Sequence, residues 1–455
     1  MTDVFADWTA PPALNARLAA GRERRRTTSR RTLAALTTTD RDPLGILAAQ
    51  TATRVQELIP LRDERMAASP FAFYRGTAAI MAADLARDSH SQILVASCGD
   101  AHVANFGFYA SPQRTLMFDL NDFDEAGWAP WEWDLKRLVT SIVIAGQATS
   151  RDETVVRAAA LAAVQTYARS LAAGVRRSAL VRYFTHFDAV TGIRNMDRES
   201  RRALKAAIRD AEKRTGDRAA RKLTEVGANG RLTFVERPPT MTHVDQTVTA
   251  RVHEHIADYV ATANVDVRVV LQQYVVADLA RRVVGVGSVG TRCYVVVFQD
   301  GEGNALLLQA KEAGRSVLEQ FGGIEQPAAL TTHVEQYGQG ARVVALQRIL
   351  QAVSDPFLGH LRNMLAEREI DFYVRQFHDM KGGVDMETLD DGPFHRYAQV
   401  CAATLARAHS QSGTAATVAG YIGNGKVVGD AILEYAFAYA ALSLADYTAF
   451  VAARA

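Results

Sequence analysis

Cysteine is scarce in this chain of 455 residues, which contains 3 cysteines. Cys98, Cys293 and Cys401 are too few and too scattered for a disulfide framework or a zinc site, and this usage is typical of a reducing compartment. A strong net charge is also absent, since 52 basic and 50 acidic residues leave a formal charge of +2. Nothing in the overall balance therefore favours a nucleic-acid partner.

Long apolar runs are lacking as well. The N-terminus begins Met1-Thr2-Asp3-Val4 without an apolar signal core, and no run approaches the length of a membrane span. We therefore expect a soluble, cytoplasmic protein with no membrane partner. The 48% hydrophobic and 22% charged residues are ordinary for a globular chain long enough for two or three domains or lobes.

Charge is concentrated near the N-terminus. A run of arginines between Arg22 and Arg31 lies within residues 1–50, which are rich in alanine, arginine and threonine and lack firm periodicity. We expect a basic arm with a short helix there. Such a run usually marks a solvated segment and less often a phosphate-binding patch.

The most informative segment is 98–107, which is followed by an acidic run at 118–125. A hydroxyl nucleophile must lose its proton to a base, and Mg2+ takes hard oxygen ligands, so phosphoryl-transfer enzymes hold an aspartate base close to an asparagine and a further carboxylate. Asp100 is the predicted base, and Asn105 and Asp122 are the predicted Mg2+ ligands. The alternative is that these three are ordinary turn and cap residues.

Neighbouring side chains extend this predicted site. Asp124 is a further candidate oxygen ligand, and Asp119 is the alternative to Asp122 as the main metal aspartate. His102 could carry a proton or orient the loop through a hydrogen bond. The apolar segment 92–97 predicts a buried strand that ends just before the predicted base, and a loop held by a strand end is well placed for catalysis.

A second motif, G-x-G-x-x-G, follows an apolar strand at Gly285, Gly287 and Gly290, and it includes Ser288. A dinucleotide-binding turn must continue into a helix, whereas a kinase glycine loop continues into a second antiparallel strand. The continuation at 294–298 is rich in β-branched and aromatic residues, which predicts a strand. The motif is therefore interpreted as a nucleotide-binding glycine loop of the kinase kind.

A hairpin turn at 300–304 leads to a third apolar strand, 305–311, which ends in Lys311. Glycine loop, hairpin and lysine in this order predict a lysine that binds the phosphates of ATP. The helix expected next carries Glu319, the predicted carboxylate partner of the lysine, with Glu325 as the fallback. A solvated lysine at a strand end and an exposed glutamate are the alternatives.

Other segments complete the prediction. The stretch 342–348 is predicted to be another strand of the small sheet, and helical patterns cover 131–185, 196–224 and the segment from 397 onward. Guanidinium groups suit bidentate contact with carboxylate or phosphate, so three arginines could bind an anionic substrate or the phosphates of ATP, with structural ion pairs as the alternative. These are Arg65, Arg75 and Arg375.

The pattern Gly99-Asp100-x-His102-x-x-Asn105 resembles the catalytic loop of aminoglycoside phosphotransferases and choline kinases. In those families the aspartate is the base and the asparagine binds the metal. By the same resemblance, Asp122 matches their metal-binding aspartate and Asp134 their downstream structural aspartate. One departure is Cys98, which stands where these families usually have a histidine.

Six longer motifs carry a second resemblance: Arg65-Met66-x-x-Ser69-Pro70-Phe71-x-Phe73-Tyr74-Arg75-Gly76, Gly99-Asp100-Ala101-His102, Asn121-Asp122-Phe123-Asp124-Glu125, Gly285-x-Gly287-Ser288-x-Gly290, Lys311-Glu312-Ala313 and Leu405-Ala406-Arg407-Ala408-His409. Together they are similar to the bacterial domain-of-unknown-function 2252 family, from about residue 54 to residue 450. This second resemblance implies no particular activity.

The glycine loop and Lys311 follow the catalytic motif in this chain, whereas they precede it in ordinary kinases. A circular permutation explains the order, because the segment 397–409 resembles the helix that leads into the catalytic loop of the phosphotransferases. Permutation is tolerated where domain termini lie close together on the surface.

The expected fold is therefore α+β and protein-kinase-like, circularly permuted, with a mostly helical large lobe and a small lobe built on an antiparallel sheet. The expected division is a basic arm at 1–50, the large lobe with the catalytic and metal loops at 51–260, a β-rich nucleotide-binding lobe at 261–380, and C-terminal helices that return to the large lobe at 381–455.

The functional prediction is a phosphotransferase that uses ATP and Mg2+ and acts on a small-molecule or protein hydroxyl, with the acceptor and the oligomeric state left open. A nucleotide-binding regulatory module without catalysis is the first alternative. A metal-dependent hydrolase using Asp100, His102, Asp119, Asp122 and Asp124 is the second, and it leaves the glycine loop unexplained. A dinucleotide-dependent oxidoreductase is disfavoured because no helix is predicted after the glycine motif.

Overall fold

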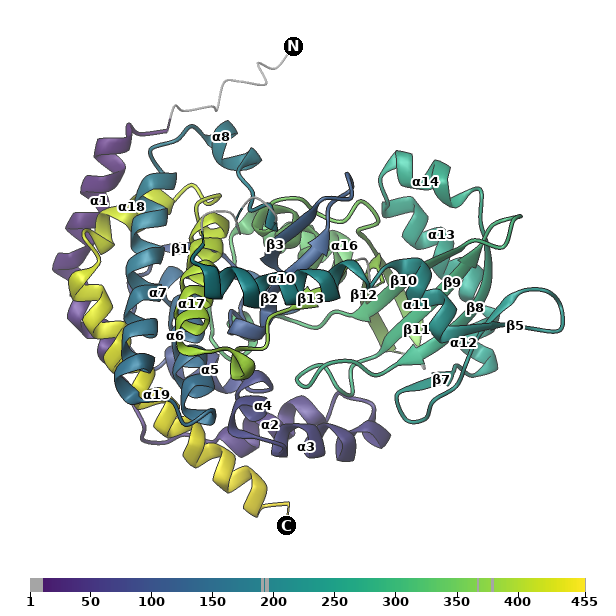
Figure 1. Ribbon diagram of the computed structural model, residues 1–455, viewed down its shortest axis with the longest axis horizontal. Coiled ribbons are helices and arrows are strands. Elements are labelled where there is room, and N and C mark those ends of the chain that lie inside the picture. The colour runs from purple at the N-terminus through teal and green to yellow at the C-terminus, as the bar shows by residue number, and fades with distance from the viewer. Residues whose placement is uncertain (1–10, 190–191, 193–195, 366–367, 378–379, 455) are drawn as a thin grey trace.

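The computed structural model describes residues 11–189, 192, 196–365, 368–377 and 380–454. Within these residues the chain forms an α+β structure whose strands pair in antiparallel fashion. Figure 1 shows a helical part on one side and, on the other, a sheet with its own covering helices.

The first helices are mostly short and lie against the helical part. They are α1 (Leu14–Thr27), α2 (Pro43–Thr51), α3 (Ile59–Ala67), α4 (Pro70–Arg75) and α5 (Ala78–Leu85). Local sequence explains where two of them begin, because Asp42 accepts a hydrogen bond from the Gly45 amide and Ser69 accepts one from the Ala72 amide, each just ahead of a proline in the first helical turn.

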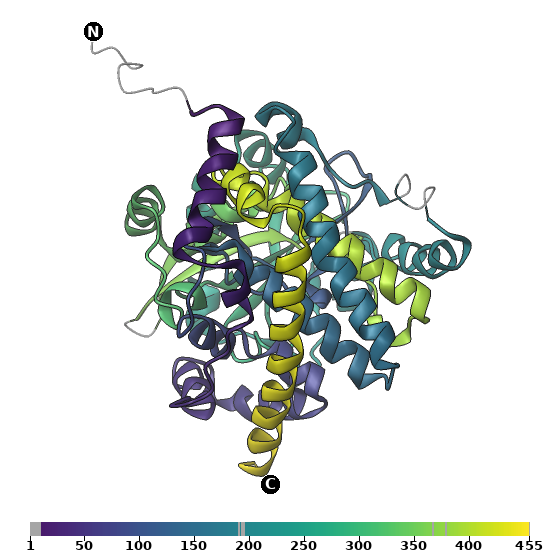
Figure 2. The same cartoon turned by 90° about the vertical axis from the view of Figure 1, so that its left-hand side faces the viewer.

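The N-terminal arm contains the short helix that we expected, α1, and this helix packs on another helix of the chain. Helix α1 runs along α18 (Ala415–Ile422), as Figures 1 and 2 both show. Arg25 Nε donates a hydrogen bond to the carbonyl of Tyr421 at 2.9 Å, and Arg30 Nη1 donates one to the carbonyl of Ile422 at 3.1 Å. The arginines satisfy the C-terminal carbonyls of a helix, which is a favourable place for cations.

Two small sheets, one of two and one of three short strands, place the candidate loops. Strand β1 (Leu94–Ser97) pairs with β4 (Gly127–Pro130), and β2 (Phe106–Ala110) pairs with β3 (Leu116–Leu120) and with the short β13 (Gly382–Gly383). The loop after β1 therefore lies next to the loop after β3, and the Asn121 amide donates a hydrogen bond to the Asn105 carbonyl at 2.9 Å. The predicted strand before Asp100 is confirmed.

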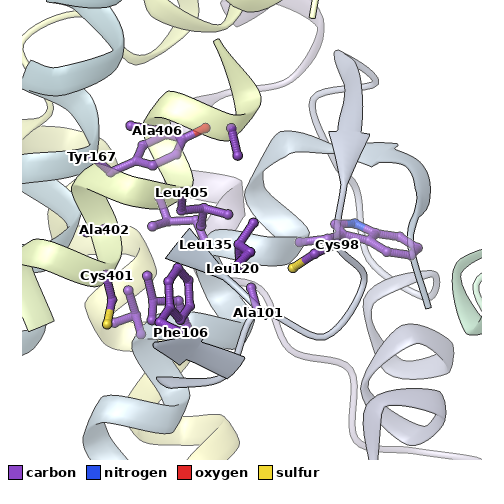
Figure 3. Close-up of a cluster of buried hydrophobic side chains, with 14 of the residues drawn as sticks. Cys98, Ala101, Phe106, Leu120, Leu135, Tyr167, Cys401, Ala402, Leu405 and Ala406 are labelled. Atoms are coloured by element: carbon purple, nitrogen blue, oxygen red, sulfur yellow. The ribbon is translucent and has the colours of Figure 1, made fainter. Parts of the chain in front are cut away.

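Long helices form the body of the helical part. They are α6 (Trp131–Ala148), α7 (Glu153–Gly174), α17 (Asp391–His409) and α19 (Lys426–Ala452). Helix α17 packs along α7, and α19 packs on both α6 and α7. Figure 3 shows Cys401 and Leu405 of α17 beside Phe106 and Leu135 in the buried core under the loop after β1.

Helix α19 is long and apolar enough, by length and composition, to cross a membrane, which the printed sequence did not lead us to expect. Half of its most apolar window, 50%, is buried inside the protein, and a core helix passes the same test. Asp446 on this helix accepts a hydrogen bond from Arg41 Nη2 at 2.7 Å, and Arg41 also pairs with Asp84 of α5. The helix is therefore tied to the N-terminal helices by a buried ionic network. The cytoplasmic location stays a prediction.

The main sheet has six strands in the order β11-β12-β10-β9-β8-β7, with every neighbouring pair antiparallel. The strands are β7 (Met241–His243), β8 (Val275–Arg282), β9 (Cys293–Gln299), β10 (Ala305–Glu312), β11 (Gly359–Leu365) and β12 (Arg368–Gln376). The glycine motif connects β8 to β9, so the expected strand, loop and strand are confirmed, and the turn at 300–304 joins β9 to β10.

Different helices cover the two faces of this sheet. The remaining elements are α8 (Ala179–Phe184), α10 (Arg198–Glu212), α11 (Gly216–Leu223), β5 (Thr224–Val226), β6 (Leu232–Phe234), α12 (Gln246–Ala250), α13 (Val252–Thr262), α14 (Val265–Leu271), α15 (Val317–Gln320) and α16 (Ala328–Leu350). Side chains of α13 and α14 form one buried cluster with the sheet, and side chains of α11 and β6 form another.

The prediction of a strand at 342–348 is wrong, because these residues lie inside α16. Val343, Val344 and Leu346 are all buried, so the segment has the continuous apolar character that a buried helix and a buried strand share. Helix α16 is interrupted at Gly338, whose φ of 85° only glycine adopts readily.

Candidate active site

The loop after β1 is held by Asp134, near the start of α6. Its carboxylate accepts hydrogen bonds from the amides of Cys98 at 2.8 Å and Gly99 at 3.1 Å. His409, the last residue of α17, lies with Nε2 3.2 Å from the same carboxylate, and its Nδ1 is 2.7 Å from the Tyr167 hydroxyl. Asp134 therefore fixes the backbone at the entry to the loop of Asp100.

Asp100 lies at the end of this loop with one oxygen bonded. Arg137 Nε donates a hydrogen bond to its Oδ1 at 2.8 Å, and Asn105 Nδ2 donates one to its backbone carbonyl at 2.8 Å. Burial raises the pKa of the Asp100 carboxyl to about 6, although the Arg137 charge opposes this shift. A carboxyl that titrates this close to neutral pH is suited to act as a general base.

His102 is close to Asp100 but is not charged at neutral pH. Its side chain is 3% exposed, and its Nε2 lies 3.6 Å from Asp100 Oδ2. Burial, followed by the charges of Arg137 and Arg75, holds the pKa of the imidazole well below its usual range. Within the described part of the chain its Nδ1 has no hydrogen-bond partner. A neutral imidazole beside Asp100 can position the carboxylate or pass a proton.

The loop after β3 brings Asp122 and Asp124 to Lys311, which is 2% exposed. Lys311 Nζ contacts Asp124 Oδ2 and lies 3.6 Å from Asp122 Oδ1. Tyr373 donates its hydroxyl hydrogen to Asp124 Oδ1 at 2.5 Å, so both oxygens of Asp124 are engaged. Asp124, a predicted metal ligand, is therefore occupied in holding Lys311.

Asp122 is the aspartate with an available oxygen. Its Oδ1 is buried and has no hydrogen-bond partner among the residues that the structure describes. Burial opposes ionisation, yet the pKa of Asp122 is lowered because the charges of Lys311 and Arg375 outweigh it. The carboxylate is thus ionised, and Lys311 Nζ, 3.6 Å from Oδ1, is its nearest cation. Asp119, the alternative metal aspartate, is turned away and accepts a hydrogen bond from the Ala352 amide at 2.8 Å.

Strand register explains why these charges face the loop. Successive side chains alternate across a sheet, so Gln309 and Lys311 of β10 share one face. In the pairing with β12, Lys311 is opposite Tyr373 and Gln309 is opposite Arg375. Arg375 Nε donates a hydrogen bond to Gln309 Oε1 at 3.1 Å, and its Nη1 donates one to the carbonyl of Asn121 at 3.4 Å. Arg375 therefore supports the loop after β3.

The expected pair of Lys311 and Glu319 is not formed. Glu319, on α15, accepts a hydrogen bond from Arg315 Nη2 at 2.7 Å, while the ionic partners of Lys311 are Asp122 and Asp124. Glu325, the fallback partner, is exposed. The carboxylates that contact Lys311 therefore come from the loop after β3 and not from α15, the next helix in the sequence.

The glycine loop is held from outside by the N-terminal segment 54–76. Arg54 Nη1 donates a hydrogen bond to the Val289 carbonyl at 2.5 Å, and the Val55 amide donates one to the Gly290 carbonyl at 2.8 Å. Arg65 Nη1 donates one to the Gly285 carbonyl at 2.7 Å. Arg65, a candidate substrate residue, therefore holds the backbone of the loop.

Backbone geometry explains why the three positions of the motif are glycines. Gly285 and Gly290 have φ values of 73° and 89°, which favour glycine. A Cβ on Gly287 would lie 3.2 Å from the carbonyl oxygen of Arg75 and 3.4 Å from the Cα of Gly76. The loop consequently approaches α4 closely at its middle glycine.

A cavity of about 220 Å³ lies between the glycine loop, the loop after β1 and the loop after β3. The predicted residues that line it are Arg75, Asp100, His102, Asn105, Asp122, Asp124, Gly285, Gly287 and Ser288. Arg375 lines a separate cavity of about 260 Å³ on the other side of the loop after β3, together with Asn121 and Lys381. Most of the predicted site is thus assembled around one cavity from chain segments far apart in sequence.

Several residues of the site escaped the sequence interpretation. Arg137 contacts the predicted base, and Glu125 accepts a hydrogen bond from the Val317 amide at 2.8 Å and lines the cavity. Arg342, 1% exposed on α16, donates hydrogen bonds to the carbonyls of Ala126, Asp124 and Gly314. Arg137 follows Asp134 by one helical turn, which is the one signal that points to it; the contact made by Arg342 depends on tertiary packing alone.

The oxygens available at the cavity are better suited to Mg2+ than to a metal ion whose ligands all come from the protein. No group of three or more histidine, cysteine, aspartate or glutamate side chains suited to a metal occurs in the described parts of the chain. Mg2+ usually takes one or two carboxylates and completes its shell with phosphates and water. Asp122 with its unbonded Oδ1, and the side-chain oxygen of Asn105, could supply the protein's share.

The fold and the site define an α+β protein in which a glycine-loop hairpin faces an aspartate-rich cavity. The chain belongs to the DUF2252 family, because the family model, described as an uncharacterized protein conserved in bacteria, matches residues 54–453. No curated protein and no solved structure matches the chain significantly.

Proposed function

We propose that the protein is a phosphotransferase that uses ATP and Mg2+, with a kinase-like, two-lobe fold in circularly permuted order. The observation that carries this proposal is the shared cavity, which is lined by the glycine loop, by Asp100 and Asn105, and by Asp122. These are the parts that phosphoryl transfer needs, namely a backbone cradle for phosphates, a base, and oxygen ligands for Mg2+.

Each residue has one role in this proposal. Asp100 accepts the proton of the acceptor hydroxyl, and Arg137 keeps its carboxylate oriented at 2.8 Å. Asp122 and Asn105 would hold Mg2+, which when bound neutralises charge on the phosphates. Lys311, kept charged because Asp122 and Asp124 raise its pKa despite its burial, binds phosphate oxygens.

The end of α17 supports the proposed permutation. His409 contacts Asp134, which in turn binds the amides of Cys98 and Gly99 at the entry to the loop of Asp100. A helix that leads into a catalytic loop in an unpermuted chain would end at this position. The end of α17 and the start of the loop of Asp100 therefore lie close together in space, although they are far apart in the sequence.

The hydrolase alternative fits less well, because one of its five side chains does not line the cavity and another is already bonded on both oxygens. Asp119 is bonded to the Ala352 amide, and Asp124 is bonded to Lys311 and Tyr373. A regulatory module that binds nucleotide without catalysis has the same cavity and is separated from an enzyme only by measurement.

The first experiment is thermal unfolding of the full chain with ATP plus Mg2+, with ATP plus a chelator, and with NAD. A ligand that binds the folded state raises its stability by about 2.7 kcal/mol at a concentration of one hundred times Kd. We expect a clear rise in melting temperature with ATP plus Mg2+ and none with NAD. No shift with any adenine nucleotide would refute both the enzyme and the regulatory module.

The second experiment separates those two by following release or transfer of the terminal phosphate from labelled ATP. Asp100→Asn should abolish turnover and leave ATP binding within about twofold, because the base acts on the acceptor. A variant that keeps full phosphotransfer would show that Asp100 is not the base. A wild-type protein that binds ATP but neither hydrolyses it nor transfers its phosphate would favour the regulatory module.

A further inference from the structure

Among the residues that the structure describes, Arg75 is a charged side chain of the cavity without a hydrogen-bond or ion-pair partner. It lies at the end of α4, is mostly buried and lines the cavity. Its Nε is buried without a hydrogen bond, and the described residues provide it with no ion pair. The other two arginines that line the cavity are both bonded, since Arg54 donates to the Val289 carbonyl and Arg315 donates to Glu319.

A buried guanidinium without a partner is costly, because it has lost water and gained no hydrogen bond. Burial lowers the pKa of Arg75, and the charges of Asp100 and Asp122 partly offset this effect. Those two carboxylates are close enough to act on Arg75 through their charge, yet neither forms an ion pair with it. The missing partner is therefore an anion that enters the cavity.

The position of Arg75 indicates which anion this is. Its backbone carbonyl lies against Gly287, so the guanidinium comes from the element that touches the middle of the glycine loop. Glycine loops of this kind cover the phosphates of ATP. Arg75 therefore lies between the loop expected to cover the phosphates and the two carboxylates expected to act at the transferred one.

We propose that Arg75 is a catalytic residue that binds the transferred, terminal phosphoryl group of ATP. This inference rests on the proposed function. In the step itself the acceptor oxygen forms a bond to the terminal phosphorus, the bond from phosphorus to the bridging oxygen of ADP breaks, and ADP leaves with the electron pair. The acceptor proton passes to Asp100, and Arg75 donates hydrogen bonds to the non-bridging oxygens throughout.

An anionic group on the acceptor has the same chemistry as the terminal phosphate. The contact between Arg75 and the glycine loop favours ATP as the source, since that loop is expected to contact the nucleotide and not the acceptor. Ligands that differ only in the terminal group can separate the two sources without knowledge of the acceptor.

The test is calorimetric binding of three ligands, each with Mg2+: ADP, a non-hydrolysable ATP analogue, and ADP with aluminium fluoride, which imitates the phosphoryl group in transfer. We compare the wild type, Arg75→Ala and Arg75→Lys. A hydrogen bond to a charged group changes affinity by about 10–100-fold. Arg75→Ala should therefore bind ADP within about twofold of wild type and lose about 10–100-fold with ADP plus aluminium fluoride.

Arg65→Ala is the matched control. Arg65 also contacts the glycine loop, at the Gly285 carbonyl, but does not line the cavity. A loop-positioning role changes the affinity for all three ligands together, and we expect that pattern for Arg65→Ala. Arg75→Lys keeps the charge with fewer donors and should show a smaller selective loss, which also covers the case in which the alanine variant does not fold.

The outcomes are distinguishable. A wild-type protein that binds none of the three ligands refutes the proposed function and, with it, this role for Arg75. Suppose that the wild type binds all three ligands. Equal affinities of Arg75→Ala and wild type for ADP with aluminium fluoride would then overturn the role of Arg75 at the transferred phosphate but not the proposed function. An equal loss with ADP and with the aluminium fluoride complex also overturns it, in favour of a role in holding the loop.

Discussion

The titration of Asp100 gives the most direct test of the site, because its pKa follows from burial and from one charged neighbour. Burial raises the pKa of this carboxyl to about 6, and the guanidinium of Arg137, with Nε 2.8 Å from Oδ1, opposes the shift. A neighbouring arginine lowers the pKa of an aspartate by about 1–3 units. Arg137→Met should therefore raise the pKa of Asp100 from about 6 to roughly 7–9, whereas Arg137→Lys keeps a positive charge and should leave it closer to the wild-type value.

The assay is a carbon-detected NMR titration of the aspartate carboxyls, with Asp100→Asn to assign the resonance. Turnover gives an independent readout, because a general base must be deprotonated. The rate should rise with pH to a plateau above about 6, with about a tenfold loss one unit below that pKa, and Arg137→Met should move the rising limb to higher pH.

Stability has a defined sign as well. Folding raises the pKa of Asp100 above its usual value, so protonated Asp100 favours the folded state at acid pH, and this contribution is lost as the pH rises to about 6. A wild-type Asp100 that titrates near 4, or one whose pKa is the same in Arg137→Met, would refute the reasoning.

Three further predictions follow from single contacts. Lys311→Met should weaken binding of ATP with Mg2+ by at least about tenfold in calorimetry, since the buried cation that contacts Asp124 and lies close to Asp122 is lost, while exposed Lys205→Met should not change it. Equal affinities would exclude Lys311 from the phosphate site. Arg342→Met leaves the carbonyls of Asp124 and Gly314 without this donor and should lower the free energy of unfolding in urea by about 3 kcal/mol. A loss below about 1 kcal/mol would show that these hydrogen bonds contribute little to stability. Gly290→Ala forces a side chain onto a φ of 89° and should cost about 1–3 kcal/mol, whereas Gly301→Ala, with open space around it, should be nearly neutral in the same assay; equal costs would show that the loop conformation is not strained.

The sequence pattern was sufficient to predict those elements whose structure is decided by local residues. The strand before Asp100 and the strands on either side of the glycine motif were predictable, because short apolar or β-branched runs bounded by turn residues are typical of strands. The segment 342–348 was not, since a short apolar run is equally suited to a buried helix.

Contacts between side chains that are far apart in the sequence could not be predicted from it. Lys311 could be placed at a strand end, but its contact with Asp124 depends on the register between β10 and β12 and on the loop after β3. The same is true of Arg75: only the structure shows that its Nε has no hydrogen bond among the described residues, whereas the other two arginines of the cavity are bonded. A motif predicts which residues carry chemistry, whereas tertiary packing decides which of them are free to do so.

The contact between Asp134 and His409 has a consequence for the newborn protein. These residues are 275 positions apart, so a chain growing on the ribosome exposes the loop of Asp100 long before α17 emerges. Until then Asp134 lacks its imidazole partner and α7 lacks the helix that packs along it. A translation product that stops before residue 391 would contain the loop of Asp100 without the imidazole that contacts Asp134, so this order of elements delays completion of the proposed site until synthesis is almost finished.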